Sequence, residues 1–308
     1  MSGREADTIT IPSPTGVDIA ADVYAPPPPE TSPQPGAGGA ATGQRRAPVV
    51  LAHGGGQTRH SWGGTARRLA TTGHDVVSID LRGHGDSAWA PDGDYHMSAF
   101  RDDALAVVEW AQQRFGEPVA WVGASLGGMT GLHAISSEPD RFCALVLVDI
   151  TPRPAAAGVS RILEFMAKDA ESGFATLDDA ADAIAAYQPH RPRPSDLSGL
   201  AKNLRQGPDG RWRWHWDPAF LNLRTGESSE HARDAHHGEL ETFARGLRVP
   251  TLLVRGRLSD LVTQEEVDAF LEIVPHAHYV DVADAAHMIA GDKNDVFTDA
   301  VVSFLDRS

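Results

Sequence analysis

A serine enclosed by glycines ends an apolar run between residues 118 and 128, PVAWVGASLGG. The run begins with the composition of a buried strand, and the glycines that follow favour a sharp turn over further strand. Gly123 to Gly127 matches the pattern G-x-S-x-G, in which the serine occupies a strained turn between a strand and a helix, here expected to start at Leu126. Ser125 is therefore predicted to be an exposed nucleophile for acyl transfer.

A structural explanation of the same residues is that the glycines only permit a tight turn and that Ser125 caps the following helix. The glycine run in LAHGGGQTRHSW, at 51–62, argues against it, because glycines let backbone N–H groups approach a ligand closely. The N–H groups of Gly55 and Leu126 would form a two-donor site for a developing oxyanion, with about 3 kcal/mol from each donor. The two glycine-rich segments together indicate catalysis.

Five segments resemble, in order and spacing, the α/β-hydrolase superfamily: HGGGQTRHSW at 53–62, DLRGHGDS at 80–87, GASLGG at 123–128, GRLSDLV at 256–262 and AAHMIAG at 285–291. The resemblance covers nearly the whole chain outside a proline-rich loop and a helical insertion. It implies a serine hydrolase in which Asp80 and His53 have structural roles. It also implies no cofactor, and a metal is not expected because no H-E-x-x-H or comparable ligand spacing is present.

A serine hydroxyl needs a base within hydrogen-bond reach, and the base needs an orienting carboxylate. The resemblance implies the order serine, acid, histidine, and so assigns Ser125, Asp260 and His287 to these roles. Asp260 and His287 both follow predicted strands, at the end of a parallel sheet where sites form. Asp149 closes the strand-like run 143–150 and is the alternative acid, since some family members take theirs from that position.

The strand pattern lapses from 151 to 246, where helix-like segments, among them 195–206, are separated by prolines. In the family such an insertion is a cap that selects the substrate. The stretch RWRWHWDP at 211–218 has alternating tryptophans, which either anchor the cap or line a pocket, with His215 facing solvent. The expected substrate-binding residues are Trp62, Trp214, Phe165, Tyr187 and Met288.

The expected reaction is hydrolysis of a carboxylic ester or lactone of a small, mostly apolar substrate through an acyl-enzyme. Two alternatives stay open: a carbon–carbon bond hydrolase or lyase that uses the same serine triad, and a receptor that binds a ligand without turnover. Epoxide hydrolases and dehalogenases need a carboxylate where this chain has Ser125, which makes those chemistries improbable.

Apolar runs alternate with helix-like stretches along most of the chain, which predicts a mostly parallel central sheet with helices on both faces. The first 25 residues instead alternate apolar and polar side chains around a Pro-Thr-Gly turn, as in an antiparallel hairpin at the sheet edge. We expect an α/β-hydrolase core at 1–150 and 247–308 and a helical cap at 151–246, inserted after the sixth strand. Residues 26–47 are expected to be a flexible Pro/Gly-rich loop.

The charge balance excludes nucleic acid as a partner. The 27 lysine and arginine residues are outnumbered by 42 aspartate and glutamate residues, which gives a net charge of −15. The single cysteine, Cys143, lies in an apolar run and is most simply a buried side chain. No signal peptide or membrane span is evident, so we expect a cytoplasmic protein with a small-molecule substrate and an oligomeric state that the sequence leaves open.

Overall fold

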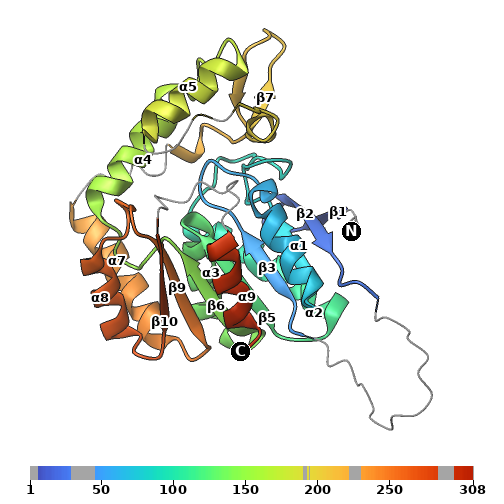
Figure 1. Cartoon of the computed structure of the whole chain (residues 1–308), viewed down its shortest axis with the longest axis vertical. Helices are drawn as coiled ribbons and strands as arrows, with labels where there is room; N and C mark the ends of the chain where they lie inside the picture. The colour runs from blue at the N-terminus through green and yellow to red at the C-terminus, as the bar shows by residue number, and fades with distance from the viewer. Residues whose placement is uncertain are drawn as a thin grey trace.

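The computed structural model describes residues 6–28, 46–189, 193, 195–221, 230–283 and 295–307. An eight-stranded sheet with the order β1-β2-β4-β3-β5-β6-β9-β10 forms its centre (Figure 1). The strands are β1 Asp7–Pro12, β2 Asp18–Tyr24, β3 Val49–Ala52, β4 Val76–Ile79, β5 Val119–Ala124, β6 Phe142–Val148, β9 Thr251–Gly256 and β10 His278–Val282. The apolar runs expected at 118–128 and 143–150 contain β5 and most of β6, and the expected hairpin is formed by β1 and β2.

The six strands β4, β3, β5, β6, β9 and β10 run parallel, whereas β2 pairs antiparallel with both β1 and β4. Every residue of β3, β4 and β5 is buried. This explains why these strands are continuously apolar in sequence, because a parallel sheet is covered on both faces. The predicted fold class and the edge hairpin are confirmed.

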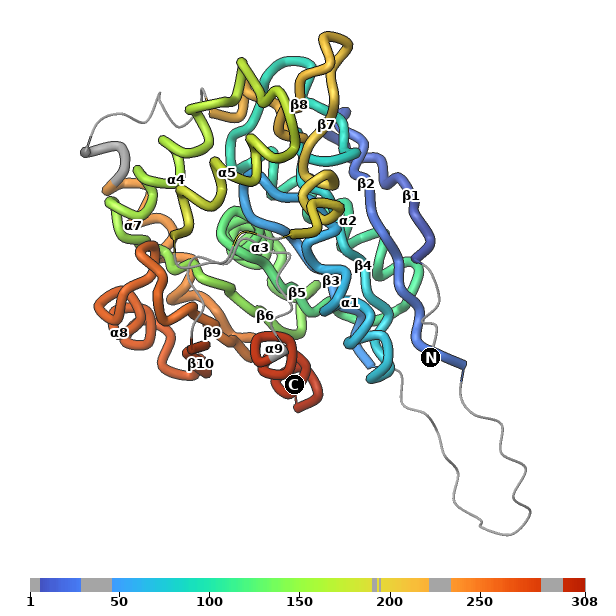
Figure 2. Tube along the Cα trace, turned by 45° about the horizontal axis from the view of Figure 1, so that its top comes forward, coloured from blue at the N-terminus to red at the C-terminus, as the bar shows by residue number. Residues whose placement is uncertain are grey.

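Helices cover both faces of the sheet, as Figure 2 shows. One side carries α1 Gly63–Thr71, preceded by the short helix η1 Arg59–Trp62, together with α9 Asp295–Leu305. The other side carries α2 Met97–Phe115, α3 Leu126–Ser137 and α8 Gln264–Ile273, and the short helix η2 Pro139–Arg141 follows α3. These layers bury the apolar side chains of the sheet and fix the positions of its strand ends.

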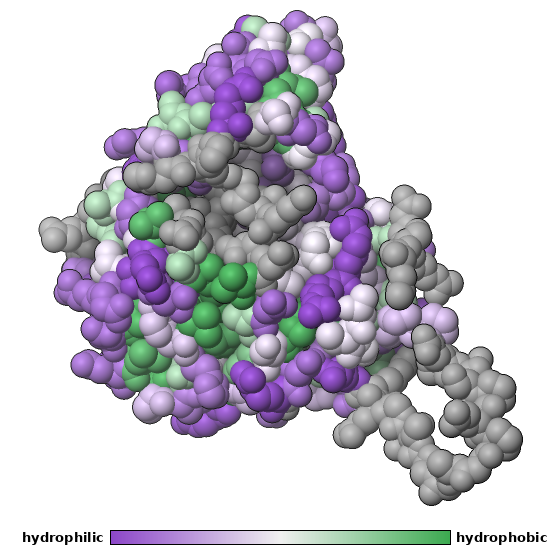
Figure 3. All heavy atoms as spheres, viewed as in Figure 1, coloured by the Kyte–Doolittle hydropathy of each residue, from purple (hydrophilic) through white to green (hydrophobic). Residues whose placement is uncertain are grey.

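The chain between β6 and β9 forms an arm above the strand ends, made of α4 Ala156–Lys168, α5 Leu177–Tyr187, η3 Leu200–Asn203 and the antiparallel pair β7 Leu204–Gln206 and β8 Trp212–Trp214. The outer surface of this arm is mostly hydrophilic in Figure 3. The helix predicted at 195–206 is wrong: residues 195–199 contain a bend and a turn, Leu200–Asn203 form only a short 3-10 helix, and Leu204–Gln206 form a strand. Leu204 pairs with Trp214 across the hairpin, and that long-range pairing outweighs the local helical spacing.

The last helix of the insertion, α7 Glu230–Gly246, packs on α3 and α8 rather than on the arm. It therefore belongs to the layer that covers the sheet, although it lies within the 151–246 segment. Most of the 26–47 loop, from 29 to 45, lies outside the described residues. No helix in the described part of the chain is long and apolar enough to cross a membrane.

Candidate active site

Ser125 is the single residue between the end of β5 and the start of α3, and its φ of 44° lies in the left-handed region. The turn is tight because β5 and α3 approach each other at glycines: a Cβ on Gly123 would collide with the backbone of Gly127. The Ser125 N–H donates to Val148 O at 3.0 Å, which ties the turn to the neighbouring strand β6. Ser125 is only half-buried, as a nucleophile that must meet a substrate requires.

The glycine run after β3 lies directly beside this serine. A Cβ on Gly54 would be 3.4 Å from Ser125 Cβ. The Gly54 N–H donates to Gln57 Oε1 at 3.1 Å, and the Gly127 N–H donates to His53 O at 3.1 Å. Among the described residues, no hydrogen bond engages the N–H groups of Gly55 or Leu126, the two predicted oxyanion donors. Leu126 directly follows the nucleophile in sequence, and Gly55 directly follows Gly54, the glycine that lies beside it.

His53 holds the glycine run in place. Its Nδ1–H donates to Gly54 O at 2.7 Å, and its Nε2 accepts from the Leu81 N–H at 3.0 Å. Complete burial lowers its pKa to about 4, so that the ring is neutral at physiological pH. This is the structural role that the sequence indicated.

Asp80 holds the segment that follows β4. It accepts from the N–H of Arg59 at 2.6 Å and from the N–H of Asp86 at 2.9 Å, and it pairs with the Arg59 guanidinium. Arg59 also pairs with Asp22 at 2.9 Å. Asp86 pairs both with Arg59, at 2.8 Å, and with Arg205 of the arm, at 3.1 Å. The chain of ion pairs therefore joins the hairpin, the core and the arm.

Asp149 occupies the strand end next to Ser125. Ala124 is paired with Val148, so that Ser125 and Asp149 each come one residue after a register pair of β5 and β6. Asp149 is 1% exposed and has φ 51°, the other left-handed non-glycine residue among those described. Its carboxylate accepts from Ser259 Oγ at 2.8 Å.

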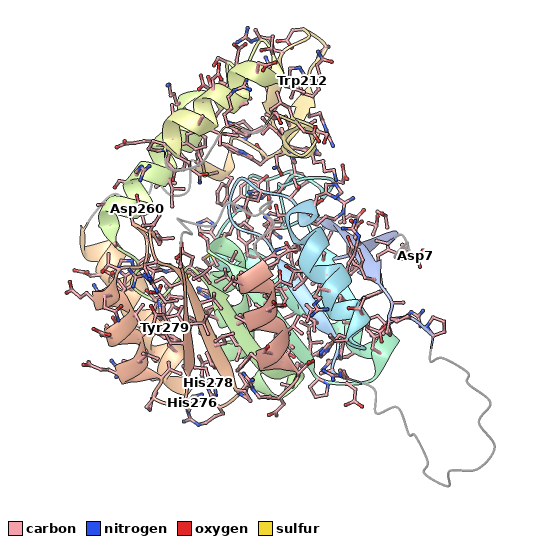
Figure 4. All side chains as sticks on the ribbon, viewed as in Figure 1. Asp7, Trp212, Asp260, His276, His278 and Tyr279 are labelled. Carbon is pink, nitrogen blue, oxygen red and sulfur yellow. The ribbon has the colours of Figure 1, made fainter. Side chains whose placement is uncertain are left out.

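Asp260 points toward the arm. Arg161 on α4 donates to its carboxylate at 2.6 Å and to Tyr187 O at 2.5 Å, and the guanidinium lies 4.8 Å from the centre of the Tyr187 ring. The Asp260 side chain is 36% exposed. In Figure 4 it lies beside the end of α4, where the arm meets the core. Among the described residues, the Asp260 carboxylate is therefore bound by the arm, through Arg161.

His287 and Met288 lie outside the described residues, since β10 ends at Val282 and α9 begins at Asp295. Their assignments as base and as substrate contact remain predictions.

The aromatic residues expected to bind substrate mostly contact one another within the arm. Phe165 stacks on Tyr187 with ring centres 4.2 Å apart and lies 5.9 Å from Trp214, while Trp214 lies 5.4 Å from Phe174. Burial raises the pKa of Tyr187 to about 12. These contacts give the arm its own small core, so packing accounts for these side chains without a substrate.

Trp62 is not at the site. It is 2% exposed and packs against Phe297 of α9, with ring centres 5.8 Å apart, on the face of the sheet that α1 covers. His215 was expected to face solvent, but its side chain is only 11% exposed. Its backbone O accepts a hydrogen bond from the Gly85 N–H at 2.8 Å. This bond turns the segment inward onto the core.

Three other side chains cover the glycine run. A Cβ on Gly55 would be 3.7 Å from the Phe220 ring, and a Cβ on Gly56 would be 3.3 Å from Met166 Cε and 3.7 Å from Trp216 Nε1. The sequence did not single out Phe220. Met166 had a weak signal, since it continues the apolar face of α4 that begins at Val159 and Ile162.

The chain belongs to the alpha/beta hydrolase fold family, whose model matches residues 47–293. It is 30% identical over 267 residues to the esterase Rv0045c of Mycobacterium tuberculosis, covering 84% of this chain and 82% of that one. It is 24% identical to the esterase YbfF of Escherichia coli, covering 84% and 93%. The crystal structure of Rv0045c superposes with a TM-score of 0.68 at 26% identity, covering 99% of this chain and 93% of that one.

Proposed function

We propose that this protein hydrolyses a carboxylic ester or lactone of a small, mostly apolar substrate through an acyl-enzyme at Ser125. One observation carries the proposal: Ser125 is half-exposed at a strained turn, with Gly54 of the glycine run against it. A nucleophile and backbone donors in this arrangement are what acyl transfer requires.

That the protein is a carboxylic ester hydrolase agrees with the names of its relatives. Besides the two esterases above, it is similar to a 3-hydroxybutyrate-oligomer hydrolase of Cupriavidus necator, at 28% identity over 78% of this chain. Two of these relatives are named only as esterases and the third as a hydrolase of 3-hydroxybutyrate oligomers, so kinship supports ester chemistry and leaves the substrate to be decided by the pocket.

In the proposed mechanism His287 takes the Ser125 proton as the hydroxyl attacks the ester carbonyl carbon. The negative charge that develops on the carbonyl oxygen is held by the N–H groups of Gly55 and Leu126. The tetrahedral intermediate collapses when His287 gives its proton to the departing alcohol, which leaves the acyl group on Ser125. Water, deprotonated by His287, then attacks this ester and releases the acid.

For the acid that orients His287, the geometry favours Asp149 over Asp260. Asp149 is buried at the strand end beside Ser125, and Ser259 holds its carboxylate. A buried carboxylate with a fixed orientation is suited to holding an imidazole in one tautomer. Asp260 is half-exposed and already paired with Arg161, so its charge is directed to the arm.

The test is labelling with a fluorophosphonate probe alongside turnover of short p-nitrophenyl esters, for the unaltered protein and Ser125→Ala. Both signals should be present and should vanish in the variant. Labelling without ester turnover would favour carbon–carbon hydrolysis or lyase chemistry by the same serine. No labelling would mean that Ser125 is not activated, and ligand binding without turnover would become the better explanation.

A further inference from the structure

We propose that Phe220, Met166 and Trp216 form a fixed wall of the acyl pocket and restrict the enzyme to esters of short, uncharged, apolar acids. The inference rests on the proposed ester hydrolysis at Ser125 and extends it to the choice of acyl group.

The position of the wall follows from its contacts with the glycine run. Phe220 covers Gly55, and Met166 and Trp216 cover Gly56, so closely that a Cβ added to either glycine would meet them at 3.3–3.8 Å. Gly55 and Gly56 are themselves half-buried, whereas the three covering residues are between 3% and 6% exposed. A substrate whose carbonyl oxygen meets the Gly55 N–H therefore has these side chains as its nearest neighbours on that side.

The position of the wall relative to the strands indicates which part of the ester contacts it. The glycine run follows β3, which lies on one side of β5, whereas β6, β9 and β10 lie on the other. The proposed base follows β10, and it must reach the oxygen of the departing alcohol. The alcohol is therefore expected on the β10 side of Ser125 and the acyl group on the β3 side, against Phe220.

Hydrogen bonds to the core hold the wall in place. His84 and Trp216 form an antiparallel bridge, and the Asp217 N–H donates to Gly83 O at 2.8 Å. The Tyr95 hydroxyl donates to the Asp217 carboxylate at 2.5 Å. The Phe220 N–H donates to Asp217 O at 3.0 Å, which fixes the turn that carries the ring. This part of the insertion is therefore bound to the core, unlike the half-buried aromatic pair of α4 and α5.

Aromatic rings behind Phe220 prevent it from turning away. Its ring centre lies 5.2 Å from that of His84, 6.0 Å from Tyr95 and 6.1 Å from Phe100, each in an edge-on arrangement. Complete burial lowers the pKa of His84 to about 3, so that this neighbour is uncharged. Among the described residues, the rings that contact Phe220 are those of His84, Tyr95 and Phe100, and none of them offers a positive charge to a charged acyl group, whose desolvation would go uncompensated.

The experiment measures kcat/KM for p-nitrophenyl esters from acetyl to decanoyl, which share one leaving group and differ only in the acyl chain. The unaltered enzyme should prefer the acetyl and butyryl esters. Phe220→Ala should raise the ratio of decanoyl to butyryl kcat/KM by at least about tenfold, because removing the ring lengthens the pocket. Phe220→Leu should raise the same ratio by a smaller factor. It is the variant to measure if Phe220→Ala does not fold.

The matched control is Phe243→Ala, which removes the same ring from α7, where it packs edge-on against His133 with ring centres 5.1 Å apart. Its decanoyl-to-butyryl ratio should stay within about twofold of the unaltered enzyme. An unchanged ratio in both Phe220 variants, or a preference for the decanoyl ester in the unaltered enzyme, would contradict the proposal that the wall restricts the length of the acyl group. No ester turnover at all by the unaltered protein would instead contradict the proposed function, and the acyl pocket with it.

Discussion

Ser259 Oγ donates a 2.8 Å hydrogen bond to the carboxylate of Asp149, joining the loop after β9 to the end of β6. The same hydroxyl accepts from the N–H groups of Leu261 and Val262, at 3.1 and 3.2 Å. The segment GRLSD thus supports the carboxylate beside Ser125 through its serine, while its aspartate pairs with the arm. The neighbouring residues Ser259 and Asp260 therefore have different contacts: Ser259 binds the carboxylate beside Ser125, and Asp260 binds Arg161 of the arm.

The first prediction separates the two candidate acids. Asp149→Asn should lower kcat on p-nitrophenyl butyrate by about a thousandfold or more, because an amide does not stabilise the imidazolium that forms on the base. Asp260→Asn should change kcat by less than about threefold, since its carboxylate is half-exposed and pairs with Arg161. Steady-state kinetics on both variants decide between them.

Circular dichroism of both variants should match that of the unaltered protein, which excludes loss of fold as the cause. A large fall in kcat for Asp260→Asn with little change for Asp149→Asn would return the acid role to Asp260.

The sequence predicted the central strands well because β3, β4 and β5 are buried on both faces and therefore stand out as apolar runs. The mostly exposed edge strand β1 was predicted instead from its alternating apolar and polar residues. The sequence also predicted the elbow, since only glycine fits where Gly123 meets Gly127. The resemblance assigned the acid to Asp260 and kept Asp149 as the alternative, because both follow strands; the partners of the two carboxylates, which the sequence does not show, are what favour Asp149.

The arm was harder to predict, since its elements depend on contacts that are distant in the chain. The strand at Leu204 exists because Trp214 pairs with it, and His215 is buried because of its bond to Gly85. Phe220 carries no local signal at all. Its position is set by Asp217, which Tyr95 holds from 122 residues away.

The second prediction concerns the buried ion pairs of Arg59. Arg59→Met should lower the free energy of unfolding by about 3–5 kcal/mol, since it leaves the buried carboxylates of Asp80 and Asp22 without their cation. Arg205→Met, at the exposed end of the same network, should cost less than about 1 kcal/mol. Urea unfolding measures both, and equal losses would contradict this account.

The third prediction tests the elbow. Gly127→Ala should destabilise the protein by about 3 kcal/mol, or prevent folding, because its Cβ would collide with the backbone of Ala52 and His53. Gly64→Ala, at an exposed position of α1 with open space around it, should leave stability unchanged or raise it by up to about 1 kcal/mol. Thermal unfolding compares the two, and a tolerated Gly127→Ala would show that the turn is looser than described.

The fourth prediction is a pH dependence of stability from His133. Burial, with His236 and Arg101 nearby, lowers its pKa from 6.5 to about 4. Between these values the unfolded chain binds a proton that the folded chain does not, so this histidine makes stability fall as the pH drops through that window. His133→Leu should remove up to about 2 kcal/mol of the loss between pH 6.5 and 5.

The control for this prediction is His96→Gln, since the side chain of His96 is 69% exposed. Urea unfolding at several pH values should give this variant the same slope as the unaltered protein. A slope that is unchanged in His133→Leu would assign the acid sensitivity to other groups.

The most direct test of the central claim is to trap the acyl-enzyme. The protein is mixed with p-nitrophenyl butyrate, quenched in acid during turnover and analysed by peptide mass spectrometry. The account predicts one butyryl group on the peptide that carries Ser125 and none in Ser125→Ala, which should also lose turnover. Ester turnover that persists in Ser125→Ala, or that proceeds in the unaltered enzyme with the acyl group on another residue, would contradict it.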